Sequence, residues 1–348
     1  MKKVLVILPY ANKHLELFFR YIEKHYKVEY FVHGRSDQYR KNIKDNALKI
    51  QSIGYLMACK NLIKRKYEIV FTHGIFYPYL IFLHFSNRNT IIILSEGFRN
   101  NFEKGLKGVF KHLHIKRLTK NNNVNLFMLG DLNIKEQYEK LKPHKIQYFQ
   151  YGMYPGLTSV LNTKSAYTNP VKFVFAGQFI PRKNIDLMLD SILQTPQFQT
   201  GEAEFTFIGE GPEADKINSN ANVKLIATLS KESLLKVLSN SDVLVLVSSY
   251  EGWGAIINEA SACGCVLIIS QKVGAGTLFF KDNENGYIAL FNKESLSNLF
   301  KLLIEDRKGL SKMKEASLKI FTSVYNEHDH NLSNIIAFAV NPDCLPIE

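Results

Sequence analysis

Apolar runs of strand length alternate with longer segments of helical periodicity along almost the whole chain. In the first half these runs lie at residues 4–8, 28–32, 69–72, 90–94, 124–128 and 146–149. A run that is apolar throughout is typical of a strand buried on both faces, and the helical segments between the runs are the crossover connections that parallel strands need. The first half is therefore predicted to fold as a parallel sheet covered by helices.

The same pattern begins again in the second half, after a turn-rich stretch that contains Pro155. Its apolar runs lie at residues 171–176, 205–208, 223–226, 243–247, 266–269 and 287–290. With 348 residues the chain is long enough for two domains, and open parallel sheets bind ligands beyond the carboxyl ends of their strands. We expect an α/β protein with two doubly wound, Rossmann-like parallel-sheet domains that face an interdomain cleft. The expected parts are residues 1–155, residues 156–325 and a C-terminal segment, 326–348, that packs back on the first domain.

Charge is distributed unevenly between the two halves. Residues 1–150 contain 27 Lys and Arg against 11 Asp and Glu, whereas residues 151–348 contain 17 against 21. A basic half can attract nucleic acid, anionic lipid or a pyrophosphate-bearing molecule, and surplus lysine can also serve solubility alone. Charge by itself does not choose among these partners.

The composition is that of a soluble globular protein, with 46% hydrophobic and 22% charged residues. The four cysteines have neither the density of a disulfide framework nor the paired spacing of a metal site, so reduced thiols are expected. The longest apolar stretch, residues 74–85, is too short to span a bilayer and contains Pro78 and His84. We therefore expect a cytoplasmic protein.

Two carboxylates, Glu251 and Glu259, flank a glycine-containing turn that follows a strand and opens a helix. Gly252 and Gly254 allow the backbone to bend so that successive N–H groups face outward at the helix start, where free donors and the helix dipole attract phosphate. The carboxylates suit the hydroxyls of a polyhydroxylated ligand. A sugar nucleotide would use both features, although an ordinary helix with a glycine N-terminus and a surface glutamate gives the same pattern.

Other strand ends in the second half carry similar chemistry. Gly177 ends a strand, and Arg182 and Lys183 follow just before a helix for which Asn184 is the expected cap. Positive charge at a helix start opposes the helix dipole, so two cations there favour a pyrophosphate ligand over solvated charge. Two glycines after the next strand are expected to permit close approach of a ligand: Gly209 and Gly211.

The order and spacing of these motifs resemble the family 4 retaining glycosyltransferases of the GT-B architecture, through residues 173–184, 207–212, 241–249, 251–264 and 285–286. The resemblance implies that Lys183 contacts the pyrophosphate of a nucleoside diphosphate sugar. It also implies that Glu251 touches the hydroxyls of the transferred sugar and that Glu259 holds the ribose. Four backbone amides would cradle the distal phosphate, those of Gly252, Trp253, Gly254 and Ala255.

One position departs from the family, whose members commonly have arginine directly after the glycine of the first motif. This chain has Gln178 there, and Arg182 can share that charge role. Because no Asp-x-Asp motif for a divalent ion occurs, we expect no metal and no other cofactor. Lys183, Arg182 and the helix amides would instead stabilise the leaving diphosphate. The His-Asp-His triplet at residues 328–330 is expected to be a solvated loop rather than a metal site.

The first half offers two candidates for the acceptor side. Glu96 follows the fourth strand, where members of the family often have histidine, and a carboxylate there could orient or deprotonate an acceptor hydroxyl. His73, which ends the third strand, is the second candidate. Pairing of Glu96 with Arg99, and a structural role for His73, explain the same residues.

Residues 101–121 interleave lysine and arginine with apolar side chains. A basic amphipathic helix of this kind could make peripheral contact with an anionic membrane, on the inner face of the cell membrane. A helix packed on its own sheet with a solvated charged face has the same pattern. We favour the membrane because the resemblance implies lipid-linked acceptors.

The combined expectation is a retaining glycosyltransferase of bacterial surface polysaccharide synthesis. It would move a sugar from a nucleoside diphosphate sugar to a glycan or lipid-linked oligosaccharide, with Glu96, Glu251 and Lys183 as catalytic residues. The first domain would bind the acceptor and the second the nucleotide sugar. A sugar-nucleotide epimerase of similar architecture is the alternative, and it would convert the donor alone. A non-enzymatic nucleic-acid binder is disfavoured, and no nucleic-acid partner is expected, because no nucleic-acid module or RNP-like aromatic signature occurs.

Overall fold

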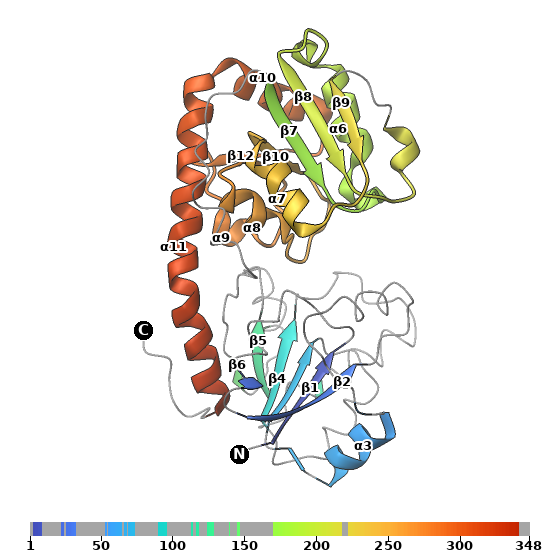
Figure 1. Cartoon of the computed structure of the whole chain (residues 1–348), viewed down its shortest axis with the longest axis vertical. Coiled ribbons are helices and arrows are strands. Elements are labelled where there is room, and N and C mark those ends of the chain that lie inside the picture. The colour runs from blue at the N-terminus through green and yellow to red at the C-terminus, as the bar shows by residue number, and fades with distance from the viewer. Residues whose placement is uncertain are drawn as a thin grey trace. The chain divides into compact units, whose positions relative to one another are not determined.

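The computed structural model divides the chain into two compact units, Met1–Pro155 with His328–Glu348 (unit 1) and Gly156–Glu327 (unit 2). It describes residues 3–8, 22–23, 26–32, 53, 55–64, 66–67, 69–73, 90–95, 113, 116–117, 124–128, 139, 145–146, 170–217 and 222–340. Each unit is built around one parallel sheet (Figure 1).

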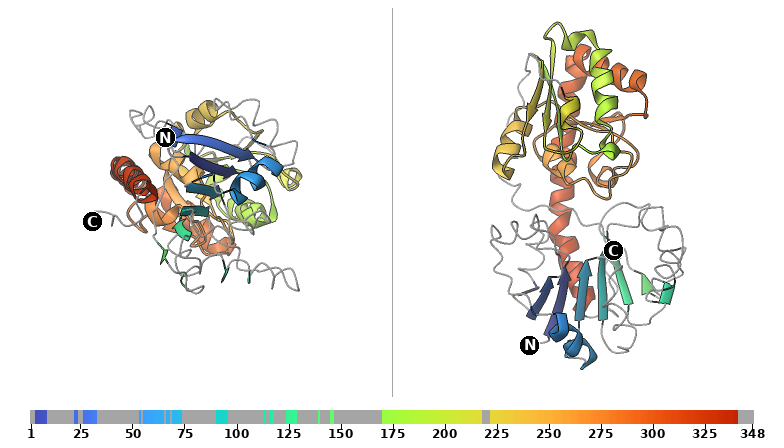
Figure 2. Two further views of the ribbon diagram at one scale, coloured as in Figure 1. Left: turned by 90° about the horizontal axis from the view of Figure 1, so that it is seen from below. Right: turned by 90° about the vertical axis from the view of Figure 1, so that its right-hand side faces the viewer.

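The sheet of unit 1 has six parallel strands in the order β2-β1-β3-β4-β5-β6. Its arrows all point the same way in the right-hand view of Figure 2. The interior strand β1 is fully buried from Val4 to Ile7, as expected for a strand covered on both faces. The strands are β1 (Lys3–Leu8), β2 (Lys27–Val32), β3 (Ile69–His73), β4 (Thr90–Ser95), β5 (Val124–Met128) and β6 (Lys145–Ile146).

Helix α3 (Tyr55–Ile63) packs beside β2 in unit 1 (Figure 1). The hydroxyl of Tyr67, just after the helix, donates a hydrogen bond of 2.5 Å to Oε2 of Glu29 on β2. Ala58 and Leu62 are buried on the inner side of the helix. Its outer side is exposed and includes large apolar residues, Leu56, Met57 and Ile63.

The sheet of unit 2 also has six parallel strands, in the order β12-β11-β10-β7-β8-β9. The two central strands, β7 and β10, are almost entirely buried. The strands are β7 (Val171–Ala176), β8 (Ala203–Ile208), β9 (Val223–Ile226), β10 (Val243–Leu246), β11 (Val266–Ile269) and β12 (Gly286–Ile288).

Helices cover both faces of this sheet, with α6 and α10 on one side and α7 and α8 on the other (Figures 1 and 2). Short 3₁₀ turns at Pro181–Lys183, Pro196–Phe198 and Ala214–Lys216 complete the connections. The helices are α6 (Ile185–Leu193), α7 (Lys231–Ser239), α8 (Ile256–Ala262), α9 (Gly276–Phe279), α10 (Lys293–Glu305) and α11 (Arg307–Val340).

An aromatic cluster under α10 forms part of the core of unit 2. Phe173 on β7 lies edge-on to Phe300 of α10, with ring centroids 5.0 Å apart, and Phe205 stacks on Phe207 at 4.5 Å. Pairs of this kind add to the stabilisation that comes from burying the rings. The phenylalanines of the apolar strands therefore also pack α10 against the sheet.

Helix α11 is fastened to unit 2 by buried polar contacts. Nζ of Lys314 donates to Oδ1 of Asp242 at 2.5 Å, and both residues are almost completely buried. The hydroxyl of Ser317 donates to the carbonyl of Cys265 at 2.7 Å. A buried ion pair is tolerated because the other oxygen of Asp242 accepts the backbone N–H of Lys172 at 2.9 Å.

All twelve predicted strands are confirmed, with small differences at their ends. The strand predicted for 243–247 ends at Leu246, and the one predicted for 287–290 is Gly286–Ile288. The prediction of a loop at residues 328–330 is wrong, because α11 runs without a break through them and through the boundary predicted at 325. Neither glycine nor proline occurs between Leu310 and Asn341, so nothing in the sequence ends the helix earlier.

Candidate functional site

The order of the strands in unit 2 creates a switch point between β7 and β10. The chain passes from β7 to β8 and β9 on one side, then returns to β10 on the other side and continues to β11 and β12. The connections leave β7 and β10 in opposite directions, and ligands of open α/β sheets bind beyond the carboxyl ends of the strands at such points. The segments that follow these two strands are the ones that carry Lys183 and Glu251.

After β7 the chain forms a 3₁₀ turn, Pro181–Lys183. Proline suits the first position of such a turn because its φ is already fixed and its missing N–H is not needed there. The N–H of Lys183 donates to the carbonyl of Ile180 at 2.8 Å. The turn directs the Lys183 side chain inward, where the residue is only 6% exposed.

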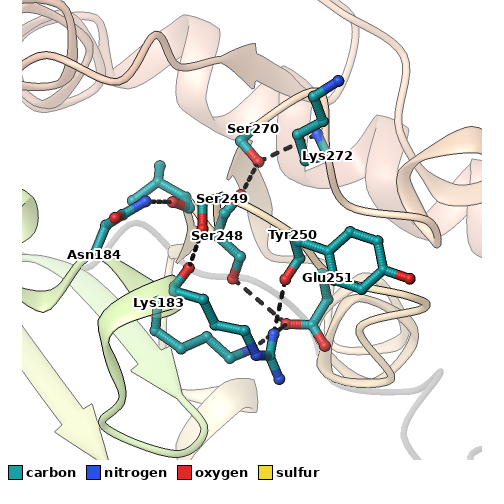
Figure 3. Close-up of polar contacts among 10 residues, drawn as sticks. Lys183, Asn184, Ser248, Ser249, Tyr250, Glu251, Ser270 and Lys272 are labelled. Atoms are coloured by element: carbon teal, nitrogen blue, oxygen red, sulfur yellow. Dashed lines mark hydrogen bonds and ion pairs between the residues drawn. The ribbon is translucent and has the colours of Figure 1, made fainter. Parts of the chain in front are cut away.

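Glu251, after β10, contacts both cations of this turn, and Figure 3 shows it next to Lys183. Its Oε2 accepts a hydrogen bond from Nη1 of Arg182 at 2.7 Å and a second from Nζ of Lys183. Nη1 of Arg182 also donates to the carbonyl of Tyr250 at 2.8 Å, and the hydroxyl of Ser248 donates to Oε2 at 3.4 Å. The other carboxylate oxygen, Oε1, accepts no hydrogen bond from any residue that the structure describes.

Burial lowers the pKa of Lys183 from its usual value, and the neighbouring charge of Arg182 lowers it further. The carboxylate of Glu251 opposes both effects by attraction and by its hydrogen bond. The cluster thus holds two cations against one anion in a partly buried place. A polyanionic ligand would restore the charge balance.

The loop that carries Glu251 is held by the loop after β11. The N–H of Glu251 donates to the carbonyl of Lys272 at 2.9 Å, and the N–H of Gly274 donates back to the carbonyl of Glu251 at 3.1 Å. The buried hydroxyl of Ser270 donates to the carbonyl of Ser248 at 2.6 Å (Figure 3). A side chain at Gly274 is excluded, since its Cβ would lie 2.3 Å from the carbonyl oxygen of Gly252.

The backbone from Gly252 to Ala255 leads into α8. Gly254 has a φ of +86°, which favours glycine, and a Cβ there would come within 3.0 Å of the Glu251 side chain. In the part of the chain that the structure describes, the N–H groups of residues 252–255 have no protein acceptor. Trp253 can offer only its backbone N–H to a ligand, because its ring is buried and Nε1 donates to Oδ1 of Asn258 at 3.2 Å.

Glu259 lies in the first turn of α8. Burial raises the pKa of its carboxyl group from 4.5 to about 7, and the charge of Lys231 opposes the rise only in part. Its carboxylate accepts no hydrogen bond from the described residues. An unpaired carboxyl group of this kind is suited to accept hydrogen bonds from ligand hydroxyls.

The glycines at the ends of β7 and β8 also have a packing role that was not predicted from the sequence. A Cβ on Gly209 would lie 2.0 Å from the carbonyl oxygen of Gly177, and one on Gly211 would lie 2.3 Å from that of Phe179. Both glycines are therefore required for two loops of the protein to pack together, whether or not a ligand approaches. Gly177 is itself beside the cation cluster, because a Cβ there would lie 3.8 Å from Nζ of Lys183.

The prediction that Asn184 caps α6 is confirmed for its position but not for a capping hydrogen bond from its side chain. Asn184 stands at the N-cap position, but its backbone is left-handed, with φ 56° and ψ 47°, and its side chain makes no capping hydrogen bond. Its Nδ2 instead donates to the carbonyl of Val247 at 2.6 Å (Figure 3). Gln178, where relatives commonly have arginine, is exposed.

The acceptor candidates of unit 1 are placed only in part. His73 ends β3, and its backbone pairs with that of Leu94 on β4. Its side chain and the whole of Glu96 lie outside the described residues, as does most of the 101–121 stretch. Among the residues described, no three His, Cys, Asp or Glu side chains gather as a metal site would require.

Several contacts of the site were not predicted from the sequence. Ser248, Ser270 and the carbonyl contact of Asn184 all fix the position of the Glu251 loop relative to the cations. The buried serines follow apolar strands, and polar residues at strand ends are a weak signal of this role. The left-handed backbone of Asn184 had no signal beyond the tolerance of asparagine for that conformation.

Comparison with known proteins follows the same division of the chain. Residues 158–319 match the family described as Glycosyl transferases group 1. A glycosyltransferase of unassigned role from Methanocaldococcus jannaschii is 27% identical over 122 residues, which cover 33% of this chain and 33% of that protein. The chain spans about a third to two fifths of the length of the curated relatives it matches.

Solved structures resemble nearly the whole chain. Anabaena HepE in complex with UDP has a TM-score of 0.72 at 13% identity, covering 97% of this chain and 100% of that one. WaaG, a glycosyltransferase involved in lipopolysaccharide biosynthesis, has a TM-score of 0.65 at 12% identity, covering 94% and 99%. At such low identity these structures establish the fold. The chain therefore has the α/β, two-domain, Rossmann-like GT-B fold of glycosyltransferases, and its second half matches the group 1 family of these enzymes.

Proposed function

We propose that this protein transfers a sugar from a nucleoside diphosphate sugar to a hydroxyl of a glycan or lipid-linked oligosaccharide. The anomeric configuration is retained, no metal is needed, and the product belongs to a bacterial surface polysaccharide. Unit 1 binds the acceptor and unit 2 binds the donor.

The observation that carries the proposal is the arrangement of Glu251 beside two cations. Arg182 and Lys183 share Oε2 of Glu251, which leaves Oε1 without a partner among the described residues. A nucleoside diphosphate sugar needs both kinds of group next to each other, because its phosphates take cations and its sugar hydroxyls take a carboxylate. The switch point between β7 and β10 is where such a ligand binds in an open parallel sheet.

The chemistry demanded of the site is stabilisation of a leaving diphosphate. Negative charge grows on the phosphate oxygens as the bond to the anomeric carbon breaks. The cations of Arg182 and Lys183 and the N–H groups of residues 252–255 meet this charge without a metal ion. Retention would follow from attack on the same face as the departing phosphate, in which that phosphate accepts the proton of the acceptor hydroxyl.

The similar proteins support a nucleotide-sugar donor and a surface-polysaccharide product. HepE was crystallised with UDP, and WaaG is described as acting in lipopolysaccharide biosynthesis. We extend both properties to this chain as part of the proposal. A uridine diphosphate sugar is therefore the first donor class to test.

Peripheral contact with an anionic membrane belongs to the same proposal. The outer face of α3 exposes three large apolar side chains, with Leu56 81% exposed, together with Lys60 and Lys64. Leu113, Lys116 and Arg117 are also exposed in the 101–121 stretch. Basic and apolar side chains next to each other, as on the outer side of α3, fit anionic lipid at the cytoplasmic face of the cell membrane. No helix in the described part of the chain is long and apolar enough to cross a membrane.

Nucleotide binding is the first test. Thermal unfolding is measured with UDP, GDP and ADP in the presence of a chelator, for the wild type, Glu259→Ala and the control Glu315→Ala, which alters an exposed residue of α11. A ligand that binds only the folded state raises the unfolding temperature. We expect stabilisation by one nucleotide, lost in Glu259→Ala and kept in the control. No stabilisation by any of the three would contradict the donor site.

Product analysis separates the reaction classes. The nucleotide sugar that binds is incubated with and without lipid-linked and soluble glycan acceptors, and the anomeric configuration is determined by NMR. Transfer with retention is expected only when acceptor is present. Conversion of the donor to an isomer without acceptor would identify an epimerase instead, and inversion would refute the retaining mechanism.

Vesicle flotation tests the membrane contact. The wild type is compared with Leu56→Ser/Ile63→Ser and with Leu193→Ser, which alters an apolar residue of unit 2 that is 70% exposed. Neutral phosphatidylcholine vesicles are compared with vesicles that also contain phosphatidylglycerol. Recovery with the anionic vesicles should fall in the α3 variant alone. Equal recovery with both lipids would refute an electrostatic contribution.

A further inference from the structure

We infer that Asn184 is a positioning residue that holds the Arg182–Lys183 cations in place for the phosphates of the donor. This inference rests on the proposed function. Asn184 touches neither the cations' charged groups nor, in the proposal, the donor. It acts through the backbone of the turn that carries them.

The turn is tied to the end of β10 at two points. Nδ2 of Asn184 donates to the carbonyl of Val247 at 2.6 Å, and the N–H of Ser249 donates to the carbonyl of Arg182 at 2.8 Å. Both bonds join the turn after β7 to the segment after β10. In the turn, they involve the residues immediately before and after Lys183. They fix the loop after β7 against the strand that leads to Glu251.

The backbone of Asn184 sets the direction in which the chain leaves the turn. Its φ of 56° and ψ of 47° place it in the left-handed region, which asparagine tolerates better than most residues. The N–H of Asn184 closes the 3₁₀ turn on the carbonyl of Pro181 at 3.1 Å, while its own carbonyl begins α6 by accepting from Met188 at 3.2 Å. One residue thus reverses the chain, starts the helix and fastens the turn.

A role confined to stability would not explain the location of these bonds. The Lys183 side chain is almost buried, so its ammonium can reach a ligand only if the turn stays within a narrow range of positions. Catalytic groups must be held within a fraction of an ångström of their working geometry. Loosening the turn should therefore weaken phosphate binding more than it weakens the fold.

Asn283 offers a matched control. Among the residues described, it is the other non-glycine with a positive φ, at 62°, and it is exposed in the turn before β12, at the amino end of that strand. Substitution of either asparagine by alanine strains the backbone in the same way. Only Asn184 adjoins the cations.

The experiment measures UDP affinity by calorimetry, kcat and KM for the donor, and the exchange rate of the Ser249 amide hydrogen. The proteins are the wild type, Asn184→Gly, Asn184→Ala and Asn283→Ala. Glycine keeps the left-handed backbone and removes only the amide contact, so UDP binding should weaken about fivefold, which is the worth of one hydrogen bond. Alanine adds backbone strain and should weaken binding by about tenfold more. In both Asn184 variants we expect the donor KM to rise, the acceptor KM to stay unchanged and the Ser249 amide to exchange faster.

Asn283→Ala should lower the unfolding temperature and leave UDP affinity and Ser249 exchange unchanged. Unchanged UDP affinity in both Asn184 variants, with only a lower unfolding temperature, would overturn the inference. If the wild type binds none of UDP, GDP and ADP, the proposed function fails, and Ser249 exchange then decides separately whether Asn184 holds the turn. Unaltered exchange would overturn the inference in that case too.

Discussion

The two sheets differ in the position of the switch point, where the chain begins to add strands on the other side of the sheet. In unit 1 the order β2-β1-β3-β4-β5-β6 puts the switch point between β1 and β3, whereas in unit 2 it lies between β7 and β10, after two further strands. Both sheets are parallel and have six strands, so the difference is one of connection and not of architecture. In unit 2 the segments that follow the two strands of the switch point bring Arg182 and Lys183 into contact with Glu251. The same rule applied to unit 1 places its ligand-binding edge at the end of β3, where His73 lies.

The charges of the two halves differ in a related way. The first 150 residues carry a large excess of Lys and Arg, and the remaining residues a small excess of Asp and Glu. Yet the cations assigned to the donor phosphates lie in the acidic half. Local placement of two cations at a strand end therefore matters more for phosphate recognition than the net charge of a domain, because only nearby and partly buried charges escape screening.

The largest effect of breaking the donor side should come from Lys183→Ala. Loss of a buried cation aimed at the leaving phosphates should lower the transfer rate by about a thousandfold, the upper range for one electrostatic donor. Steady-state kinetics provide the measurement. Lys216→Ala is the control, since Lys216 is an exposed lysine of the same unit that pairs with Asp186 at 2.6 Å. A similar loss in both variants would contradict a specific role.

Unit 1 should respond differently from unit 2. His73→Ala is expected to lower transfer by about a hundredfold, as loss of a group that orients the acceptor hydroxyl does, and to leave UDP affinity unchanged. Glu96→Gln should have the smaller effect, because Glu96 follows β4, which lies one strand further from the switch point than β3. Steady-state kinetics measure the transfer rate of both variants, and calorimetry measures their UDP affinity. A loss of UDP affinity in His73→Ala would contradict the proposal that unit 1 binds only the acceptor.

Glu251→Gln should separate sugar from phosphate recognition within unit 2. Transfer is expected to fall by about thirtyfold, because a charged acceptor for a sugar hydroxyl is lost. UDP, which has no transferred sugar, should bind at least as tightly as before, since Arg182 and Lys183 no longer share an intramolecular anion. Calorimetry with Glu232→Gln as an exposed control tests the sign, and weaker UDP binding in Glu251→Gln would reject this interpretation.

The smallest predicted effect concerns pH. The pKa of Glu259 is raised by burial to about 7, and ribose hydroxyls donate best to its ionised form. UDP affinity should therefore rise between pH 6 and pH 8, by up to about tenfold for a group of this pKa. Glu259→Gln cannot ionise, so it removes the protein's part of this dependence and leaves that of the phosphates. Identical pH profiles in the two proteins would exclude Glu259.

The free energy of unfolding should change with pH in the opposite direction to UDP affinity. The pKa of Glu259 is higher in the folded protein than its usual 4.5, so the folded state binds the proton more tightly. This contribution is complete below pH 4.5 and is lost as the pH rises through about 7. Glu259→Gln should be more stable than the wild type at pH 8 by up to roughly 3 kcal/mol and nearly equal to it at pH 4. Denaturant titrations at the two pH values measure the difference.

Much of the site could be predicted because its chemistry is local. Arg182, Lys183 and Glu251 lie in the segments that follow two apolar strands, and the carboxyl ends of parallel strands share one edge of a sheet. The contacts of Asn184, Gly209 and Gly211 that were missed have one cause. Each residue was assigned from its own segment, whereas its role depends on a backbone carbonyl from another segment, at Val247, Gly177 or Phe179.

The sequence by itself determined the twelve strands, their parallel direction and the residues that end them, because the burial of apolar runs and the crossover helices between them are properties of consecutive residues. Only the tertiary structure decided the order of the strands, and with it that β7 lies against β10. Strand order depends on which neighbours pack best in three dimensions, and no local periodicity encodes it. That choice places Lys183 against Glu251 across 68 positions of the chain, and it turns two separate strand ends into one candidate site.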